Sequence, residues 1–502
     1  MNRHHFYLLV NLGFVVFAVL GFAFHSDCAV HPLYVILLFS LCTTPMIDAT
    51  VLNGPYALLV LFSLYFFLMF GALDCHQLIF NEAGWTVPAQ SLLTTPEIII
   101  LAGALAVQVA YRLACRFFSR PRSKSPPMDW AERTLVLVGI TLWIVCTRLN
   151  WEFTVHIITE PTSAAVTRGL GSLNAVQIMI FLLARLAQPL SILILAYAQC
   201  RYRRPYMMPI VIGLVLFQLF FGFVIDFKTE ALIGGVLVVL TNLLVNARVP
   251  KIWVALMVLV ALIAFPLLQA NRAIRGEHGT NSTQASQNVF GAFEQSLAAK
   301  ERVNTGRERA QTALERLTLK GSVNLIVDGT GVVAPFKNGY TLTPIVTAFI
   351  PRIIWPDKPS IETGRILNRD FHLSEVADTY LSPSHLGELY WNFGWPGVVV
   401  GMSVIGLLLG TLGAKFNLAE APTITRVLVV VVTVRFLILA AEGEIATHYV
   451  SWMRAMLGIG LMHLFFARIP WVASAGDKGV PKAASEDSAP RATQPAFPNI
   501  LR

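Results

Sequence analysis

The sequence predicts an all-α protein, a polytopic membrane bundle of about twelve transmembrane helices with one large periplasmic loop. Composition is the first indication, since 55% of the residues are hydrophobic and 13% are charged. So few polar residues could not cover the surface of a soluble globule. The second indication is a recurrence of apolar runs of about 18 to 22 residues, each long enough as a helix to cross about 30 Å of hydrocarbon.

The apolar runs define the expected helices and, with them, the domain organisation. The expected spans are residues 6–24, 32–50, 55–74, 96–115, 133–149, 176–199, 207–225, 230–247, 252–270, 396–414, 424–440 and 449–467. Residues 1–270 therefore hold helices one to nine, and residues 396–470 hold helices ten to twelve. The large polar loop, residues 271–395, has partly helical character. Residues 471–502 have the composition of a disordered tail.

Lysine and arginine in the short loops indicate the orientation. Alternate loops carry clusters of them: Arg116, Arg120, Arg122 and Lys124; Arg201, Arg203 and Arg204; Arg248 and Lys251. Cytoplasmic loops of membrane proteins are enriched in these residues. Both termini are therefore expected in the cytoplasm and the 271–395 loop outside it. The net charge of +9 reflects this bias, so no nucleic-acid partner is expected.

Soluble-enzyme motifs are missing from the sequence. It contains no Walker loop, dinucleotide glycine fingerprint, CxxC pair or HExxH. ATP hydrolysis, redox chemistry and zinc proteolysis therefore have no sequence support. The outside loops also lack Asp-x-Asp, so a metal-held sugar nucleotide is not expected. We expect no cofactor and a metal-independent activity.

Three arginines fall within predicted spans. Arg185 lies in the middle of the sixth span, Arg435 near the outer end of the eleventh, and Arg454 one turn into the twelfth. A charge inside the bilayer costs a few kcal/mol or more, so such residues often serve function. The structural alternative stays open, because Arg435 could pair with Glu442 or Glu444, and terminal arginines can extend to the interface.

Further cations stand in the large loop. Arg272 and Arg275 directly follow the ninth span. Planar guanidinium groups bind phosphate oxygens in bidentate fashion without a metal. A lipid-linked pyrophosphate presents its anion at headgroup depth, and cations there would also stabilise a departing pyrophosphate in glycosyl transfer.

Two motifs in the loop resemble a known family. Pro-Arg-x-x-Trp-Pro-x-Lys-Pro occupies 351–359, and Gly-Glu-x-Tyr-x-Asn-Phe-Gly occupies 387–394, directly before the return to the membrane. This pattern, over about fifty residues of loop together with the topology, resembles Wzy-type O-antigen and exopolysaccharide repeat-unit polymerases, GT-C-like membrane glycosyltransferases. The resemblance implies a bacterial inner-membrane enzyme. It would polymerise undecaprenyl-pyrophosphate-linked oligosaccharides at the periplasmic face, with a polysaccharide chain-length regulator as a further partner.

The resemblance also implies roles for individual residues. Arg272, Arg275, Arg352 and Lys358 would hold pyrophosphate or orient sugars, and Glu388 or His385 would be the base that activates the acceptor hydroxyl. Some polymerases carry two loops in which an arginine precedes a glycine by ten residues. No convincing pair of this kind occurs here, which leaves the arginine roles open.

Other residues of the two motifs have structural interpretations. The prolines and glycines are expected to shape turns: Pro356, Pro359, Gly387, Gly394, Pro396 and Gly397. Trp355, Tyr390 and Trp391 are expected either to anchor the loop at the membrane interface or to stack on sugar rings.

Three other functions stay open. A ligase would move a finished glycan from the same carrier to a different acceptor. A lipid-linked glycan transporter would need polar residues along a path through the bundle, rather than at one end of it. A transferase using a polyprenyl monophosphate sugar would want an acidic residue in the first outer loop, where Asp27 stands alone.

The orientation can be tested with reporter fusions. A reporter active only outside the cytoplasm should be active when fused at Asn304 and silent at Lys124, because the arginine clusters hold residues 116–124 inside. Assay of the reporter's enzymatic activity in both fusion proteins shows on which side of the membrane each position lies. The reverse pattern would overturn the predicted topology.

Overall fold

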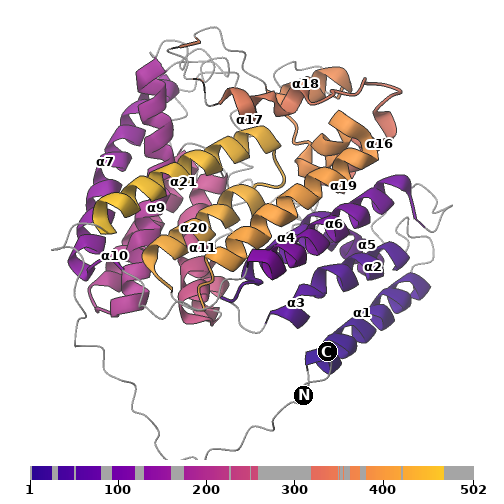
Figure 1. Ribbon diagram of the computed structural model, residues 1–502, viewed down its shortest axis with the longest axis horizontal. Coiled ribbons are helices and arrows are strands. Elements are labelled where there is room, and N and C mark those ends of the chain that lie inside the picture. The colour runs from indigo at the N-terminus through magenta and orange to yellow at the C-terminus, as the bar shows by residue number, and fades with distance from the viewer. Residues whose placement is uncertain are drawn as a thin grey trace, which may run out of the picture.

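The computed structural model describes residues 3–24, 32–49, 53–80, 93–118, 129–159, 175–224, 228–248, 250–257, 318–348, 350, 354–355, 362–373, 380–419 and 422–467. Long helices lie side by side in a bundle, and the short helices of the region after residue 318 gather at one end of it (Figure 1). Apart from an isolated bridge between Thr330 and Ala334, no strand occurs in these residues.

The helices follow the predicted spans closely. Before the large loop they are α1 (Arg3–Phe24), α2 (Pro32–Thr43), α3 (Pro45–Asp48), α4 (Ala57–Phe70), α5 (Ala72–Phe80), α6 (Thr95–Phe118), α7 (Glu132–Thr159), α9 (Ala175–Tyr202), α10 (Met207–Val224) and α11 (Lys228–Asn246). Then come α16 (Lys320–Gly329), the 3₁₀ turn η2 (Tyr340–Leu342), α17 (Thr343–Thr347), α18 (Thr363–Asp370), α19 (Ser384–Lys415), α20 (Ile424–Thr433), the π-helical η3 (Val434–Ile438) and α21 (Ile445–Ala467).

Among the described residues, six helices are long and apolar enough to cross a membrane. They are α1, α6, α7, α9, α19 and α21, and the pair α4–α5, bent by 49°, would make a seventh. The α2–α3 region, α10 and α11 are apolar but shorter. The prediction of an all-helical membrane protein is confirmed, whereas the count of twelve spans and the periplasmic loop stay predictions. Most of the predicted 252–270 span lies outside the described residues.

Helices α6 and α19 pack closely through glycines. A Cβ at Gly406 would lie 2.4 Å from the Val107 carbonyl oxygen, and one at Gly410 would lie 2.5 Å from that of Tyr111. Small residues four apart let helix backbones approach in this way. Toward the other end, Gly103 lies against Leu386. The two helices therefore run in the same direction, as the predicted alternation of spans four and ten requires.

A buried ion cluster fastens α16 to the bundle. The Lys320 ammonium lies 2.7 Å from an Asp74 oxygen, 2.8 Å from a Glu97 oxygen and 4.2 Å from the centroid of the Tyr34 ring. Burial lowers the pKa of Lys320, but the two carboxylates outweigh it and hold the pKa above its usual value. The adjacent Leu319 N–H donates to the Met69 carbonyl. This part of the large loop is thus tied to α4, α5 and α6.

Removing the cation should destabilise the fold. Lys320→Met leaves two carboxylates buried without a counter-charge, which typically costs about 3–5 kcal/mol. Thermal unfolding in detergent should show a clearly lower midpoint for this variant. Lys251→Met is the control, because Lys251 is exposed. Equal midpoints for Lys320→Met and the parent protein would contradict a role for the ion cluster in stability.

Candidate functional site

Helix α19 consists of two parts separated by Gly394. This glycine has φ 65° and ψ −158°, a backbone conformation that residues other than glycine rarely adopt. Pro396 falls in the first turn of the second part, where its missing N–H is tolerated. Residues 395–415 rise about 32 Å as helix, which matches the hydrocarbon thickness. Residues 384–393 fold back against this part, because a Cβ at Gly401 would lie 2.4 Å from the Leu389 side chain and one at Gly397 would lie 2.7 Å from the Leu389 carbonyl oxygen.

The predicted turn at Gly394 is therefore confirmed, but the turns predicted at two other glycines are wrong. Gly387 and Gly397 lie inside helical parts of α19. A Cβ at Gly387 would lie 2.9 Å from the Ile326 side chain, and one at Gly397 would lie 2.5 Å from the Phe393 Cβ. These glycines serve close packing instead.

The first turn of α19 docks on the turn formed by residues 439–444. The Ser384 N–H donates to the Glu442 carbonyl at 3.1 Å, and the His385 N–H donates to the Ala441 carbonyl at 3.0 Å. The Ser382 hydroxyl also donates to the Glu442 carbonyl. Helix N–H groups in the first turn have no partner within the helix. Their bonds to this turn bring the side chains of α19 against the start of α21.

Glu388 is the most enclosed acid in this contact, with 0% of its surface exposed. Its Oε2 accepts the Ile445 N–H at 2.6 Å, at the start of α21. The positive end of that helix dipole favours a carboxylate there. Its Oε1 has no hydrogen bond of ordinary geometry, although the Thr341 side chain lies close enough to interact. One oxygen is thus fixed, while the other can accept a proton.

Two histidines lie beside this carboxylate. His385 is 3% exposed, and its Nε2 has no hydrogen-bond partner in the described residues. Its ring centroid lies 6.4 Å from that of His448 on α21. The His448 ring packs against Gly443, where an added Cβ would lie 2.2 Å from its Nε2.

Two further carboxylates complete the group. The Glu444 Oε2 accepts the Thr363 N–H at 3.1 Å, and its Oε1 accepts the Thr447 hydroxyl. Burial and the nearby Glu444 raise the pKa of Tyr380, so its hydroxyl stays a donor. The Glu442 carboxyl receives a long bond from the Tyr65 hydroxyl, at 3.5 Å. We call the set Glu388, Glu442, Glu444, His385 and His448 the carboxylate–histidine cluster.

The described residues contain no group of three or more His, Cys, Asp and Glu side chains arranged to hold a metal ion. The chemistry that the cluster offers is proton transfer, because a carboxylate or an imidazole near a reacting hydroxyl can take its proton.

Asn392 supports the cluster from one helical turn away. Its Nδ2 donates to the Thr341 hydroxyl at 2.7 Å and to the Glu388 carbonyl at 2.8 Å, while its Oδ1 accepts the Gly339 N–H at 2.9 Å. Asn392 is 0% exposed. It therefore fixes both the helix that carries Glu388 and the η2 region that carries Thr341.

Trp391 differs from its predicted role. It is fully buried against Phe371, with ring centroids 5.6 Å apart, and Lys337 lies 5.1 Å from its ring centroid. It is thus a core residue, not an aromatic at the interface or a platform for sugars. Phe393 and Trp395, on either side of the break of α19, are 48% and 67% exposed.

The structure brings together only two of the predicted site residues, His385 and Glu388. Arg272, Arg275, Arg352 and Lys358 lie outside the described residues. Arg185 is half-buried in α9, and Arg454 is an exposed residue of α21. Arg435 is half-buried in η3, which leads into the 439–444 turn. π-Helical turns often mark functional sites.

Sequence reasoning missed Thr341, Tyr380 and Tyr65 as neighbours of the cluster. Tyr65 and Glu442 are 377 residues apart, so no local pattern could connect them. The available indication was the grouping of Glu442, Glu444 and His448 between the predicted spans 424–440 and 449–467.

A family model matches residues 147–420, more than half of the chain, and is described as a domain of unknown function (DUF8712). The chain belongs to this family. The match includes His385 and Glu388 and ends before the 439–444 turn and α21. No curated protein and no solved structure matches the chain.

The titration of Glu442 should affect stability. Burial raises the pKa of its carboxyl above the usual value. An acid with a raised folded-state pKa stabilises the fold most below its unfolded-state pKa, and this contribution is lost as the pH rises through the folded-state value. Glu442→Gln should therefore gain stability relative to the parent as the pH rises from about 4 to about 8.

Thermal unfolding in detergent across this pH range measures the effect. Glu152→Gln is the control, since its side chain is 54% exposed and its ion pair with Arg148 contributes little. A stability difference between Glu442→Gln and the parent that does not change with pH would show that Glu442 titrates normally.

Proposed function

We propose that this protein is a membrane glycosyltransferase that polymerises oligosaccharide repeat units carried on undecaprenyl pyrophosphate, at the periplasmic face of a bacterial inner membrane. The observation that carries the proposal is the state of Glu388. It is a fully buried carboxylate with one oxygen held by the Ile445 N–H and the other without a hydrogen bond from the described residues, three residues after His385. Glu388 lies in the 387–394 motif, and the family resemblance implies the same two residues as candidate bases.

The proposed step is a substitution at the anomeric carbon of the donor. Glu388 Oε1 takes the proton of an acceptor sugar hydroxyl, and the hydroxyl oxygen forms the new glycosidic bond. The bond between the anomeric carbon and the pyrophosphate oxygen breaks, and undecaprenyl pyrophosphate leaves with the electron pair. Cations of the loop, with Arg352 and Lys358 foremost, would neutralise the leaving group. His385 would orient the acceptor.

A polar contact between α7 and α9 argues against the transporter alternative. Gln188 bonds to Asn150 at 2.5 Å and to the Thr147 hydroxyl at 3.1 Å. Polar side chains that bond to one another across helices typically hold membrane helices together. This contact therefore has a packing role, whereas the enclosed acids gather at one end of the bundle.

Substitution of Glu388 distinguishes a role as catalytic base from a role as helix cap. Glu388→Gln keeps an acceptor for the Ile445 N–H but cannot take a proton, so turnover should fall about 10²- to 10⁴-fold while the melting temperature stays close to that of the parent. His385→Gln should have a milder effect. The measurement is the ladder of products formed by purified protein from undecaprenyl-pyrophosphate-linked repeat units.

Glu444→Gln is the matched control. Its carboxylate also accepts a backbone N–H at a helix start, that of Thr363 in α18, but both of its oxygens have partners. It should stay within a few-fold of the parent. A Glu388→Gln protein that makes product at the rate of Glu444→Gln would remove Glu388 from catalysis.

A further inference from the structure

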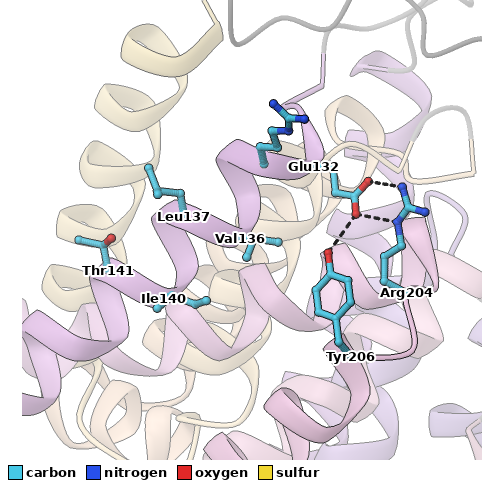
Figure 2. Close-up of a pocket in the computed structure, with 8 residues that line it drawn as sticks. Glu132, Val136, Leu137, Ile140, Thr141, Arg204 and Tyr206 are labelled. Atoms are coloured by element: carbon cyan, nitrogen blue, oxygen red, sulfur yellow. Dashed lines mark hydrogen bonds and ion pairs between the residues drawn. The ribbon is translucent and has the colours of Figure 1, made fainter.

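An open groove of ≈ 520 Å³ lies at the start of α7, beside the turn between α9 and α10 (Figure 2). Its lining comprises Glu132, Arg133, Val136, Leu137, Ile140, Thr141, Arg204 and Tyr206. The proposed catalysis uses none of these residues.

The groove has a charged end. The Arg204 Nε and Nη2 donate to the two Glu132 oxygens at 2.8 and 3.0 Å, and the Tyr206 hydroxyl donates to Glu132 at 3.4 Å (Figure 2). Arg133 is exposed beside them. Two arginines face one glutamate, so this end is net positive. The exposed Arg201 and Arg203 add to the positive charge of the same turn.

The remainder of the groove is mostly apolar. Val136, Leu137 and Ile140 come from successive turns of α7, and Leu137 is 70% exposed. From Glu132 to Thr141 the helix rises about 13 Å, close to the hydrocarbon depth of one leaflet. Because α7 is a candidate span from Glu132 onward, the charged end coincides with the end of the span.

The groove lies at the end of the bundle opposite the carboxylate–histidine cluster. Helix α9 ends at Tyr202, close to Arg204, and its Tyr197 hydroxyl donates to the Pro422 carbonyl. Pro422 follows the C-terminal end of α19, whereas the cluster is at the N-terminal end of that helix. A ligand here would be distinct from the proposed glycan donor.

We infer that this groove binds an anionic phospholipid, with the phosphate near Arg133 and Arg204 and an acyl chain along Val136, Leu137 and Ile140. The net positive end of the groove is complementary to the phosphate of such a lipid. The apolar residues further along α7 are complementary to its acyl chain. A zwitterionic lipid lacks the complementary net charge. The inference holds whether or not the protein is a glycosyltransferase.

Native mass spectrometry of the purified full-length protein tests this inference. The protein is incubated with phosphatidylglycerol, phosphatidylcholine or undecaprenyl phosphate, alone and in competition, and the retained lipid is counted. The parent should retain phosphatidylglycerol in preference. Arg133→Ala should weaken that retention about fivefold, the usual worth of one arginine near an anionic lipid. Leu137→Trp should displace the lipid by filling the groove.

Controls come from the same helix. Arg148→Ala removes an exposed arginine near the other end of the candidate span Glu132–Glu152, and Ile144→Trp enlarges a 55% exposed residue two turns beyond Leu137, on the same face. Both should retain lipid as the parent does. Equal retention of the two lipids by the parent, equal effects of Arg133→Ala and Arg148→Ala, or retention of undecaprenyl phosphate in place of phosphatidylglycerol would overturn the inference.

Discussion

The candidate site depends on two helix N-termini, those of α19 and α21, that provide hydrogen-bond acceptors for each other's N–H groups. The first turn of α19 donates the Ser384 and His385 N–H groups to carbonyls of the 439–444 turn, and the first turn of α21 donates the Ile445 N–H to Glu388. Unpaired polar groups in a buried place cost several kcal/mol, so neither helix could start here without the other. This reciprocal contact gathers acids and histidines that are distant in sequence.

The rest of the bundle holds this contact in place. Gly406 and Gly410 let α19 lie against α6, which fixes the membrane-crossing part. The break at Gly394 then separates that part from the short helix that carries Glu388. Lys320 and Asn392 secure the chain around it, the first through buried carboxylates and the second through bonds to Thr341 and the Glu388 carbonyl. A rigid support of this kind is what a positioned base requires.

The sequence predicted local features of the fold. It did not predict features that depend on contacts between residues far apart in the sequence. Apolar length is a local property, so most helices appear where the pattern places them. The predicted 55–74 span is instead bent at Gly71, since a glycine lowers helix stability and here fits against Phe67 and Leu38. Glu388 and His385, three residues apart in the sequence, lie in the same contact of α19 with the start of α21. Burial of Trp391 and the bond from Ile445 to Glu388 depend on tertiary packing that periodicity does not encode.

The most direct measurement of the central claim is the lipid-linked glycan of cells in which the gene is deleted. Loss of polymerisation should leave single repeat units on the undecaprenyl carrier at the outer face and remove long polymer, with restoration by the parent protein. Full-length polymer left on the carrier would instead indicate a ligase. Repeat units trapped on the cytoplasmic face would indicate a transporter, and either result would contradict the proposal.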